Sequence, residues 1–256
     1  MAAEDAPALT EDPAVAEDLD MALLRALATR VATARERIAA AGPQHLVSAE
    51  EDMILRRLVR ARVPGLRAAA LVRIWRELVA EARAAAAPTT LVVAPGRDPA
   101  RAIDQARLGF GGAPLNLQAQ PDAALAAARS GAVGILPLDA DKPWWGRLLA
   151  EPALKAFAAL PCLAQLGDTN ALAVAQVEPE PTGADQTFWV TDAPGPAAGV
   201  LAALARDGVA GECLAEAGGL KLFSLLGFYQ THDPRLARAP GRLSGVIGAA
   251  PTPLDV

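Results

Sequence analysis

Apolar residues recur at helical spacing through the first third of the chain. Leu24, Leu27, Val31 and Ile38 are three, four and seven positions apart, which places them on one face of a helix over about residues 15–41. At 1.5 Å per residue this helix is about 40 Å long. The other helices of the same chain segment are too short to bury an apolar stripe of that length. We therefore expect the stripe to pair with a second copy of the chain in a homodimer.

Two shorter helices are predicted after the long one. The sequence Ser48-Ala-Glu-Glu51 has the form of a capping box, and apolar residues at helical spacing follow it, which predicts a helix over about 49–62. Pro64 and Gly65 end that helix. Apolar residues that repeat from Ala70 to Ala82 predict a third helix, which ends near Ala86. Together the three helices predict a bundle over residues 15–87.

The pattern changes at Thr89 to short apolar runs separated by helical stretches. The runs at 91–94 and 132–136 read as strands, with helices between them, and this alternation is typical of an α/β region over residues 88–178. The loop that follows the second run contains Trp144 and Trp145, which either pack over this region or line a cleft.

A Pro-rich linker separates a last segment over residues 184–256. Its strands at 186–190 and 220–226 flank a helix at 196–206, which predicts an α+β region. We therefore predict a multi-domain chain: a disordered acidic leader (1–14), an all-α three-helix segment (15–87), a small α/β region (88–178) and an α+β region (184–256).

Composition restricts the kinds of core, cofactor and cellular location that we expect. Of the residues, 52% are hydrophobic but only 4% aromatic, so the core is built largely from Ala, Leu and Val. Cys162 and Cys213 do not form a disulfide framework pattern, and His45 and His232 lack ligand-type spacing, so we expect no metal and no other cofactor. An acidic amino terminus and the lack of a long apolar run predict a cytoplasmic protein that contacts no membrane.

The net charge of −5 conceals an asymmetry. Residues 19–86 carry 12 Arg and seven acids, a net of +5, whereas residues 1–18 carry −6 and residues 87–256 carry −4. Arginine without lysine suits bidentate binding of carboxylate or phosphate; the alternative is a set of solvated arginines on helix surfaces. Nucleic-acid binding is disfavoured, because the chain is acidic overall and aromatic residues are not interleaved with the arginines.

The helical segment resembles a known enzyme family. Leu19-Asp20, Leu23-Leu24, Leu27-Ala28 and Arg30 resemble the first helix of the all-helical chorismate mutases, and residues 73–79 resemble their third helix. The resemblance implies an intertwined dimer and an isomerase that rearranges the dicarboxylate chorismate to prephenate in the shikimate pathway of aromatic amino acid biosynthesis. That rearrangement is intramolecular, so the site needs cations and positioning rather than a nucleophile.

The resemblance assigns site residues by position. Arg30 matches the carboxylate-binding arginine of the family, and Glu51 matches the glutamate that binds the substrate hydroxyl, so both are candidate catalytic residues. Ala41 stands where a catalytic lysine is expected. Arg37 lies seven residues after Arg30 on the same helix face and is a candidate substrate-binding replacement; a surface role is the alternative.

The remaining chain is similar to the prephenate dehydratases. Residues 91–97 and 131–139 resemble the first lobe of those enzymes, and residues 194–254 resemble the amino-acid-sensing ACT module that ends them. Thr169-Asn170-Ala171 stands where the family has Thr-Arg-Phe, so the resemblance implies no dehydratase activity. Two functions remain open: a chorismate mutase, or a catalytically silent regulatory or binding protein derived from a bifunctional chorismate mutase/prephenate dehydratase.

Overall fold

The computed structural model describes residues 13–42, 49–61, 63–139 and 141–255. Three expectations fall outside the described residues: the leader up to residue 12, His45, and Ser48, the first residue of the expected capping box.

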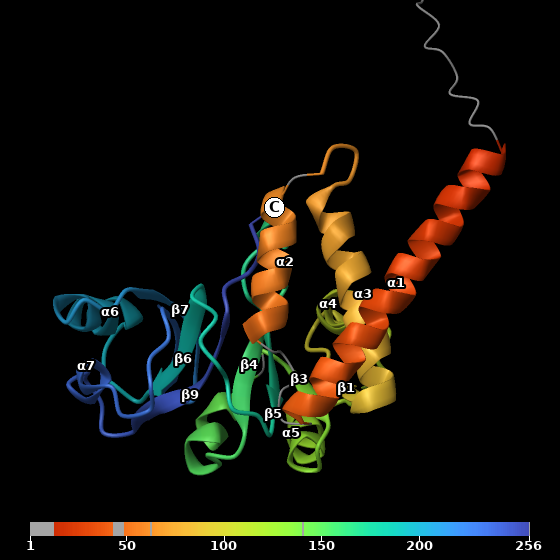
Figure 1. Ribbon diagram of the computed structural model, residues 1–256. Coiled ribbons are helices and arrows are strands. Elements are labelled where there is room, and N and C mark those ends of the chain that lie inside the picture. The colour runs from red at the N-terminus through yellow and green to blue at the C-terminus, as the bar shows by residue number, and fades with distance from the viewer. Residues whose placement is uncertain (1–12, 43–48, 62, 140, 256) are drawn as a thin grey trace, which may run out of the picture.

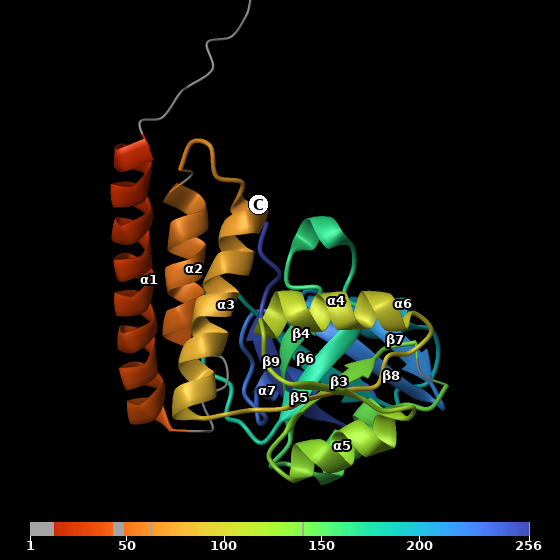
Figure 2. The same ribbon diagram turned by 90° about the vertical axis from the view of Figure 1, so that its right-hand side faces the viewer.

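Three helices form the amino-terminal part of the molecule: α1 (Pro13–Ala41), α2 (Ala49–Ala61) and α3 (Ala68–Ala86). They stand along one flank of the molecule (Figure 2), and the amino-terminal half of α1 diverges from the other two (Figure 1). Ala34 and Ile38 of α1 are buried against Ala82 of α3, which covers the carboxyl-terminal half of the stripe on α1. The structure confirms the three predicted helices.

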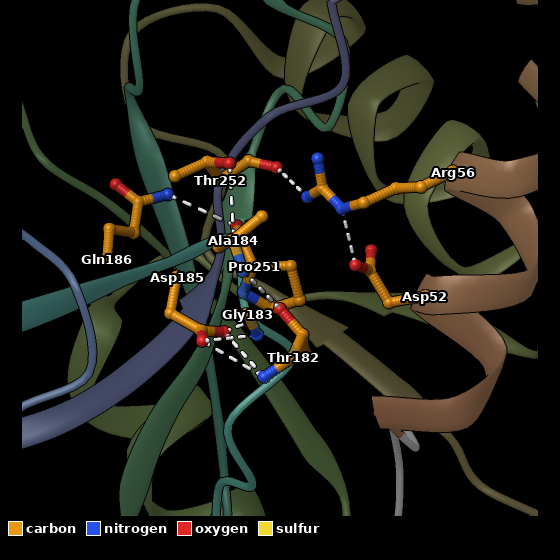
Figure 3. A network of polar contacts seen from close by, with 9 residues as sticks. All are labelled: Asp52, Arg56, Thr182, Gly183, Ala184, Asp185, Gln186, Pro251 and Thr252. Carbon is orange, nitrogen blue, oxygen red and sulfur yellow. Dashed lines mark hydrogen bonds and ion pairs between the residues drawn. The ribbon is translucent and has the colours of Figure 1, made fainter. Parts of the chain in front are cut away.

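Helices α2 and α3 also pack on the rest of the chain. Leu55 of α2 and Val72 of α3 are fully buried in one cluster with Leu108, Leu163 and Leu254. Arg56 of α2 bonds Asp52 one turn earlier and donates to the main-chain oxygen of Thr252, beyond the last strand (Figure 3). The helical segment therefore shares its core with the sheet and is not a free-standing all-α unit.

A single mixed sheet of nine strands, in the order β2-β1-β3-β5-β4-β9-β6-β8-β7, spans the rest of the chain (Figure 1). Its strands are β1 (Leu91–Val93), β2 (Leu115–Leu117), β3 (Val133–Pro137), β4 (Lys155–Leu160), β5 (Ala171–Ala175), β6 (Asp185–Thr191), β7 (Gly211–Ala217), β8 (Leu220–Leu226) and β9 (Ser244–Pro251). β1 pairs in parallel with β2 and β3, and β4 pairs in parallel with β9. The other ladders are antiparallel.

The predicted fold class, an all-α segment followed by separate α/β and α+β (ACT-like) regions, is wrong. The returning strand β9 lies between β4 and β6, so it joins strands on both sides of the predicted linker into one sheet. Gly248 allows this pairing, because a Cβ there would lie 2.0 Å from the main-chain oxygen of Ala156. The domain boundary near residue 178 stays a prediction.

Two helices cover opposite faces of the parallel strands. α4 (Pro99–Phe110) packs through Ala106 on Leu91, Val93 and Ile135, and α5 (Pro121–Arg129) packs through Leu125 in the cluster that contains Val92. Figure 2 shows the two helices on either side of the sheet. Alternate residues of each strand point to opposite faces, so both faces of this part of the sheet are buried.

Trp144 and Trp145 begin the 3₁₀ helix η1 (Trp144–Ala150) on the same face as α5. Their rings meet edge to face at 5.8 Å, and Trp144 Nε1 donates to the main-chain oxygen of Pro137 at 2.7 Å. Both indoles are almost completely buried and pack over the sheet, and Trp144 also lines a cavity on this face.

Shorter elements complete the fold. The 3₁₀ helix η2 (Ala164–Leu166) lies between β4 and β5, and α6 (Ala197–Arg206) and α7 (Pro234–Ala237) cover the sheet beside β6, β7 and β8. No helix within the described residues is both long and apolar enough to cross a membrane.

Candidate functional site

The structure brings two of the three predicted site residues into direct contact. Arg30 Nη2 on α1 donates to both carboxylate oxygens of Glu51 on α2, at 3.0 and 2.9 Å. The guanidinium also lies 4.3 Å from the centre of the Trp75 ring on α3. Arg37 instead pairs with Glu50 at 2.7 Å on the protein surface.

These contacts give Arg30 and Glu51 a role in holding the helices together. Glu51 is buried and also acts on Arg83 of α3: burial lowers the pKa of Arg83, and the charge of Glu51 opposes that shift. The residue expected to bind a substrate carboxylate and the residue expected to bind its hydroxyl thus neutralise each other. Arg30 and Arg37 line an open cavity of about 520 Å³, and a ligand contact for them stays a prediction.

A larger hollow lies at the carboxyl ends of β1 and β3, and we call it the strand-end cleft. It consists of a cavity of about 340 Å³ on the α4 side and one of about 560 Å³ on the α5 side. Ala94, Arg97, Pro137 and Asp139 line both cavities. The α4 side is completed mainly by Arg101, Gln105, Thr169 and Asn170.

The strand order explains why a cleft forms here. The chain leaves β1 through α4 to reach β2 and returns through α5 to β3, which pairs with the other edge of β1. The two connections cover opposite faces, so the loops that follow β1 and β3 diverge at their carboxyl ends. Ligands of open α/β sheets bind at such a switch point.

Tight turns place the charged residues of the cleft. Gly96 has φ +63°, and a Cβ there would lie 2.5 Å from Asp139 Oδ1, so only glycine lets the two strand-end turns approach. The main-chain nitrogen of Arg97 donates to Asp139 Oδ2 at 3.2 Å. Asp98 caps α4 by accepting from the main-chain nitrogen of Arg101 at 3.0 Å. The cap places Arg101 in the first turn of α4, on the cleft wall.

Several polar groups in the cleft have few or no protein partners. Asn170 Nδ2 is buried and has no hydrogen-bond partner. Gln105 is 5% exposed, and its side chain forms no hydrogen bond within the described part of the chain. Arg101 Nη2 makes one long bond, 3.4 Å to the main-chain oxygen of Leu166. Buried polar groups are normally satisfied, so these donors are available to a ligand.

The lining residues suit binding better than covalent chemistry. Thr169 lines the cleft, and none of the cleft's lining residues is a histidine or a cysteine, the usual partners of an activated hydroxyl or thiol nucleophile. Among the described residues there is also no group of His, Cys, Asp and Glu that could hold a metal ion.

Sequence reasoning placed the cleft residues in separate segments and did not join them into a site. Arg97 and Asp139 each follow a buried strand closely, and Asn170 precedes β5. Polar residues directly after two neighbouring parallel strands were the signal that could have located the cleft.

Comparison with known proteins gives limited similarity. The chain matches no family model and no curated protein. One solved structure, described as "GqqA- a novel type of quorum quenching acylases", aligns with a TM-score of 0.43 at 18% identity, over 64% of this chain and 95% of that chain. At this level the similarity transfers neither an activity nor a substrate.

These findings correct the expected identity. Membership of the all-helical chorismate mutases, with reduced dehydratase-like and ACT-like regions, is wrong: no family model matches, the nine-stranded sheet is continuous, and the helical segment shares its core with that sheet. The functions expected from that family are therefore wrong as well: chorismate mutase activity, the isomerase class, and a catalytically silent derivative of such an enzyme. The Leu, Ala and Arg spacing that suggested them is common to many helices; here Arg30 pairs with Glu51, whereas Leu19 and Leu24 are exposed.

Proposed function

We propose that this protein binds a small organic molecule bearing a carboxylate in the strand-end cleft. The observation that carries the proposal is the buried Asn170 Nδ2, which lacks a hydrogen-bond partner and lies in the wall of the same cavity as Arg101. A carboxylate oxygen is the acceptor that an amide donor and a guanidinium can share.

The electrostatic setting supports an anionic group on the α4 side. The amino terminus of α4 borders the cavity, and the positive end of a helix dipole favours a nearby negative charge. Arg97 and Arg101 add two cations there; Asp139 lines the same cavity and lies 4.0 Å from Arg97 Nε, and Asp98 is engaged in capping the helix. Each hydrogen bond to a charged partner contributes about 1.5–3 kcal/mol.

The α5 side would hold the remainder of the ligand. Asp139, Asp141 and Lys142 line it, and Arg147 there is already paired with Asp122 at 2.8 Å. A wall that carries both signs of charge favours a polar group, such as an amine or a hydroxyl, at the far end of the ligand. The expected cytoplasmic location remains part of this proposal.

Isothermal titration of the full chain with acetate, succinate, benzoate and L-alanine at constant ionic strength tests the proposal. We expect at least one of these to bind, and Arg101→Gln to weaken its binding about tenfold or more. Arg206→Gln is the matched control, because Arg206 is an exposed arginine on α6 that lines neither cavity of the cleft. If none binds at millimolar concentration, or if both variants bind equally well, the proposal is wrong.

A further inference from the structure

A separate cavity lies between α3 and the sheet, and we call it the helix-sheet cavity. Its volume is about 240 Å³. Leu91 and Val133, the first residues of β1 and β3, line it, so it lies at the opposite ends of these strands from the strand-end cleft. Of the residues discussed above for the cleft, none takes part in it.

The wall of this cavity is fixed by a close contact between α3 and the end of α4. Gly111 has φ +61°, and a Cβ there would lie 2.8 Å from Cβ of Ala80 and 2.9 Å from the main-chain oxygen of Arg76. The main-chain nitrogen of Gly112 donates to Glu77 Oε2 at 2.8 Å. The cavity is therefore bounded by a packed contact rather than by a loose loop.

Most of the lining is apolar. Side chains from α3, α4, β1, β3 and the turn before β2 contribute Val79, Ala80, Ala84, Leu91, Phe110, Pro114 and Val133. The hydroxyl of Thr89, which also lines the cavity, already donates to the main-chain oxygen of Ala87 at 3.2 Å. Such walls favour an apolar body over a hydrated one.

Arg76 supplies a charge at the border of this apolar cavity, because it also lines a small neighbouring cavity with Asp52 and Cys162. Its Nε is buried without a hydrogen-bond partner, and within the described residues its guanidinium forms no ion pair. Arg83, seven residues along α3, lines the same cavity, but the charge of Glu51 on α2 acts on it, so Arg76 is the cation that would hold a ligand. A partly buried cation without a counter-ion is costly, and a carboxylate in the cavity would remove that cost.

We infer that the helix-sheet cavity binds a monocarboxylate with an apolar body, with its carboxylate on Arg76 and its apolar part among Val79, Phe110 and Val133. A dry cavity of about 150 Å³ holds benzene, so one of this size holds about ten non-hydrogen atoms. Octanoate matches both the size and the chemistry. This inference does not rest on the proposed function, because the two sites share no lining residue.

Calorimetric titration of the full chain with octanoate, with 1-octanol as the uncharged probe, tests the inference. We expect octanoate to bind and 1-octanol to bind about tenfold to a hundredfold more weakly, the range that one or two charge-assisted hydrogen bonds provide. Arg76→Gln should weaken octanoate binding by a similar factor. Arg73→Gln, at an exposed arginine one turn earlier that does not line the cavity, should leave it unchanged.

A second pair of variants tests the location without altering charge. Ala84 and Ala85 are both exposed on α3, but only Ala84 lines the cavity. Ala84→Trp should block octanoate binding, and Ala85→Trp should not. Circular dichroism confirms that all four variants fold. The inference is overturned if octanoate does not bind, if it binds no better than 1-octanol, or if Ala84→Trp and Arg76→Gln bind it as the parent chain does. Arg101→Gln should retain octanoate binding, which separates this site from the strand-end cleft.

Discussion

At the scale of single residues, the main chain of Asn170 serves the fold, whereas its side-chain amide is available to a ligand. Its main-chain groups are used, since its nitrogen donates to Leu160 and its oxygen accepts from Leu138, whereas its side-chain Nδ2 has no partner. Because this donor forms no hydrogen bond within the protein, its removal should not cost the protein a hydrogen bond.

We predict that Asn170→Ala changes the free energy of unfolding by no more than about 1 kcal/mol while weakening carboxylate binding in the strand-end cleft. Urea denaturation and calorimetric titration of the same preparation measure the two effects. A large loss of stability with unchanged binding would mean that Asn170 serves the fold alone.

Asp192 is a residue whose charge the fold uses directly. Its Oδ1 accepts from the main-chain nitrogens of Leu243 at 2.9 Å and Arg242 at 2.7 Å. The bond from Leu243, above all, lowers the pKa of the Asp192 carboxyl below its ordinary value. A carboxyl with a lowered folded-state pKa contributes stability above its unfolded pKa of about 4, and that contribution is lost as the pH falls through the folded-state pKa.

We therefore predict that the thermal midpoint of Asp192→Asn falls less steeply between about pH 5 and pH 3 than that of the parent chain. Differential scanning calorimetry across this range is the measurement. Parallel curves for the two proteins would show that Asp192 does not contribute to acid sensitivity.

At the scale of elements, a small polar network fastens α2 to the sheet (Figure 3). Arg56 connects Asp52, which is 2% exposed, to the main-chain oxygen of Thr252. Thr252 in turn donates from its nitrogen to the main-chain oxygen of Ala184, directly before β6. Loss of Arg56 would leave the buried carboxylate of Asp52 without its cation.

We predict that Arg56→Gln lowers the free energy of unfolding by about 3 kcal/mol, because breaking one half of a buried pair is more costly than lacking the pair. The double variant Asp52→Asn, Arg56→Gln should recover part of this loss. Urea denaturation of the three proteins measures the difference. Equal stability of the single variant and the parent chain would contradict the anchoring role.

The elements themselves were largely predictable from local periodicity. The helices of the amino-terminal segment and strands β1, β3 and β8 carry apolar patterns that follow from their own burial. β4 was missed, because Lys155-Ala-Phe-Ala-Ala-Leu160 is rich in alanine and lacks the branched residues that mark strands.

The strand order and the candidate site were not predictable in the same way. The contact between β4 and β9 joins Ala156 to Gly248, and no local pattern records a pairing over that separation. The strand-end cleft likewise brings Arg97, Asp139 and Asn170 together from three separate turns. Convergence of this kind depends on the order of strands in the sheet, which periodicity does not encode.

At the scale of the whole molecule, part of the positive charge of the helical segment is used inside it, whereas other arginines of that segment are exposed. Arg30 bonds Glu51, Arg56 bonds Asp52, and Arg76 lines the helix-sheet cavity. Ion pairs within the helical segment therefore offset part of the charge asymmetry along the sequence.

The apolar stripe of α1 is only half covered in a single chain. Ala34 and Ile38 are buried on α3, but Leu19, Leu23 and Leu24 are 62%, 55% and 57% exposed. In Figure 1 the amino-terminal half of α1 points away from α3. We propose that a second copy of the chain covers this half, because contiguous exposed leucines on one helix are typical of helix pairing.

We predict that the full chain sediments as a dimer at micromolar concentration and that the double variant Leu23→Asp, Leu24→Asp sediments as a monomer. Burying a leucine side chain contributes about 1.5–3 kcal/mol, so placing two charges in the contact should raise the dimer dissociation constant by orders of magnitude. Leu226→Asp is the matched control, because Leu226 is 60% exposed on β8, far from α1 in the sequence. A parent chain that stays monomeric would show that no such contact forms. A dimer that survives the α1 variant and dissociates only with Leu226→Asp would show that the contact lies elsewhere. Helical content by circular dichroism should be unchanged in the monomeric variant, since the carboxyl-terminal half of α1 remains packed on α3.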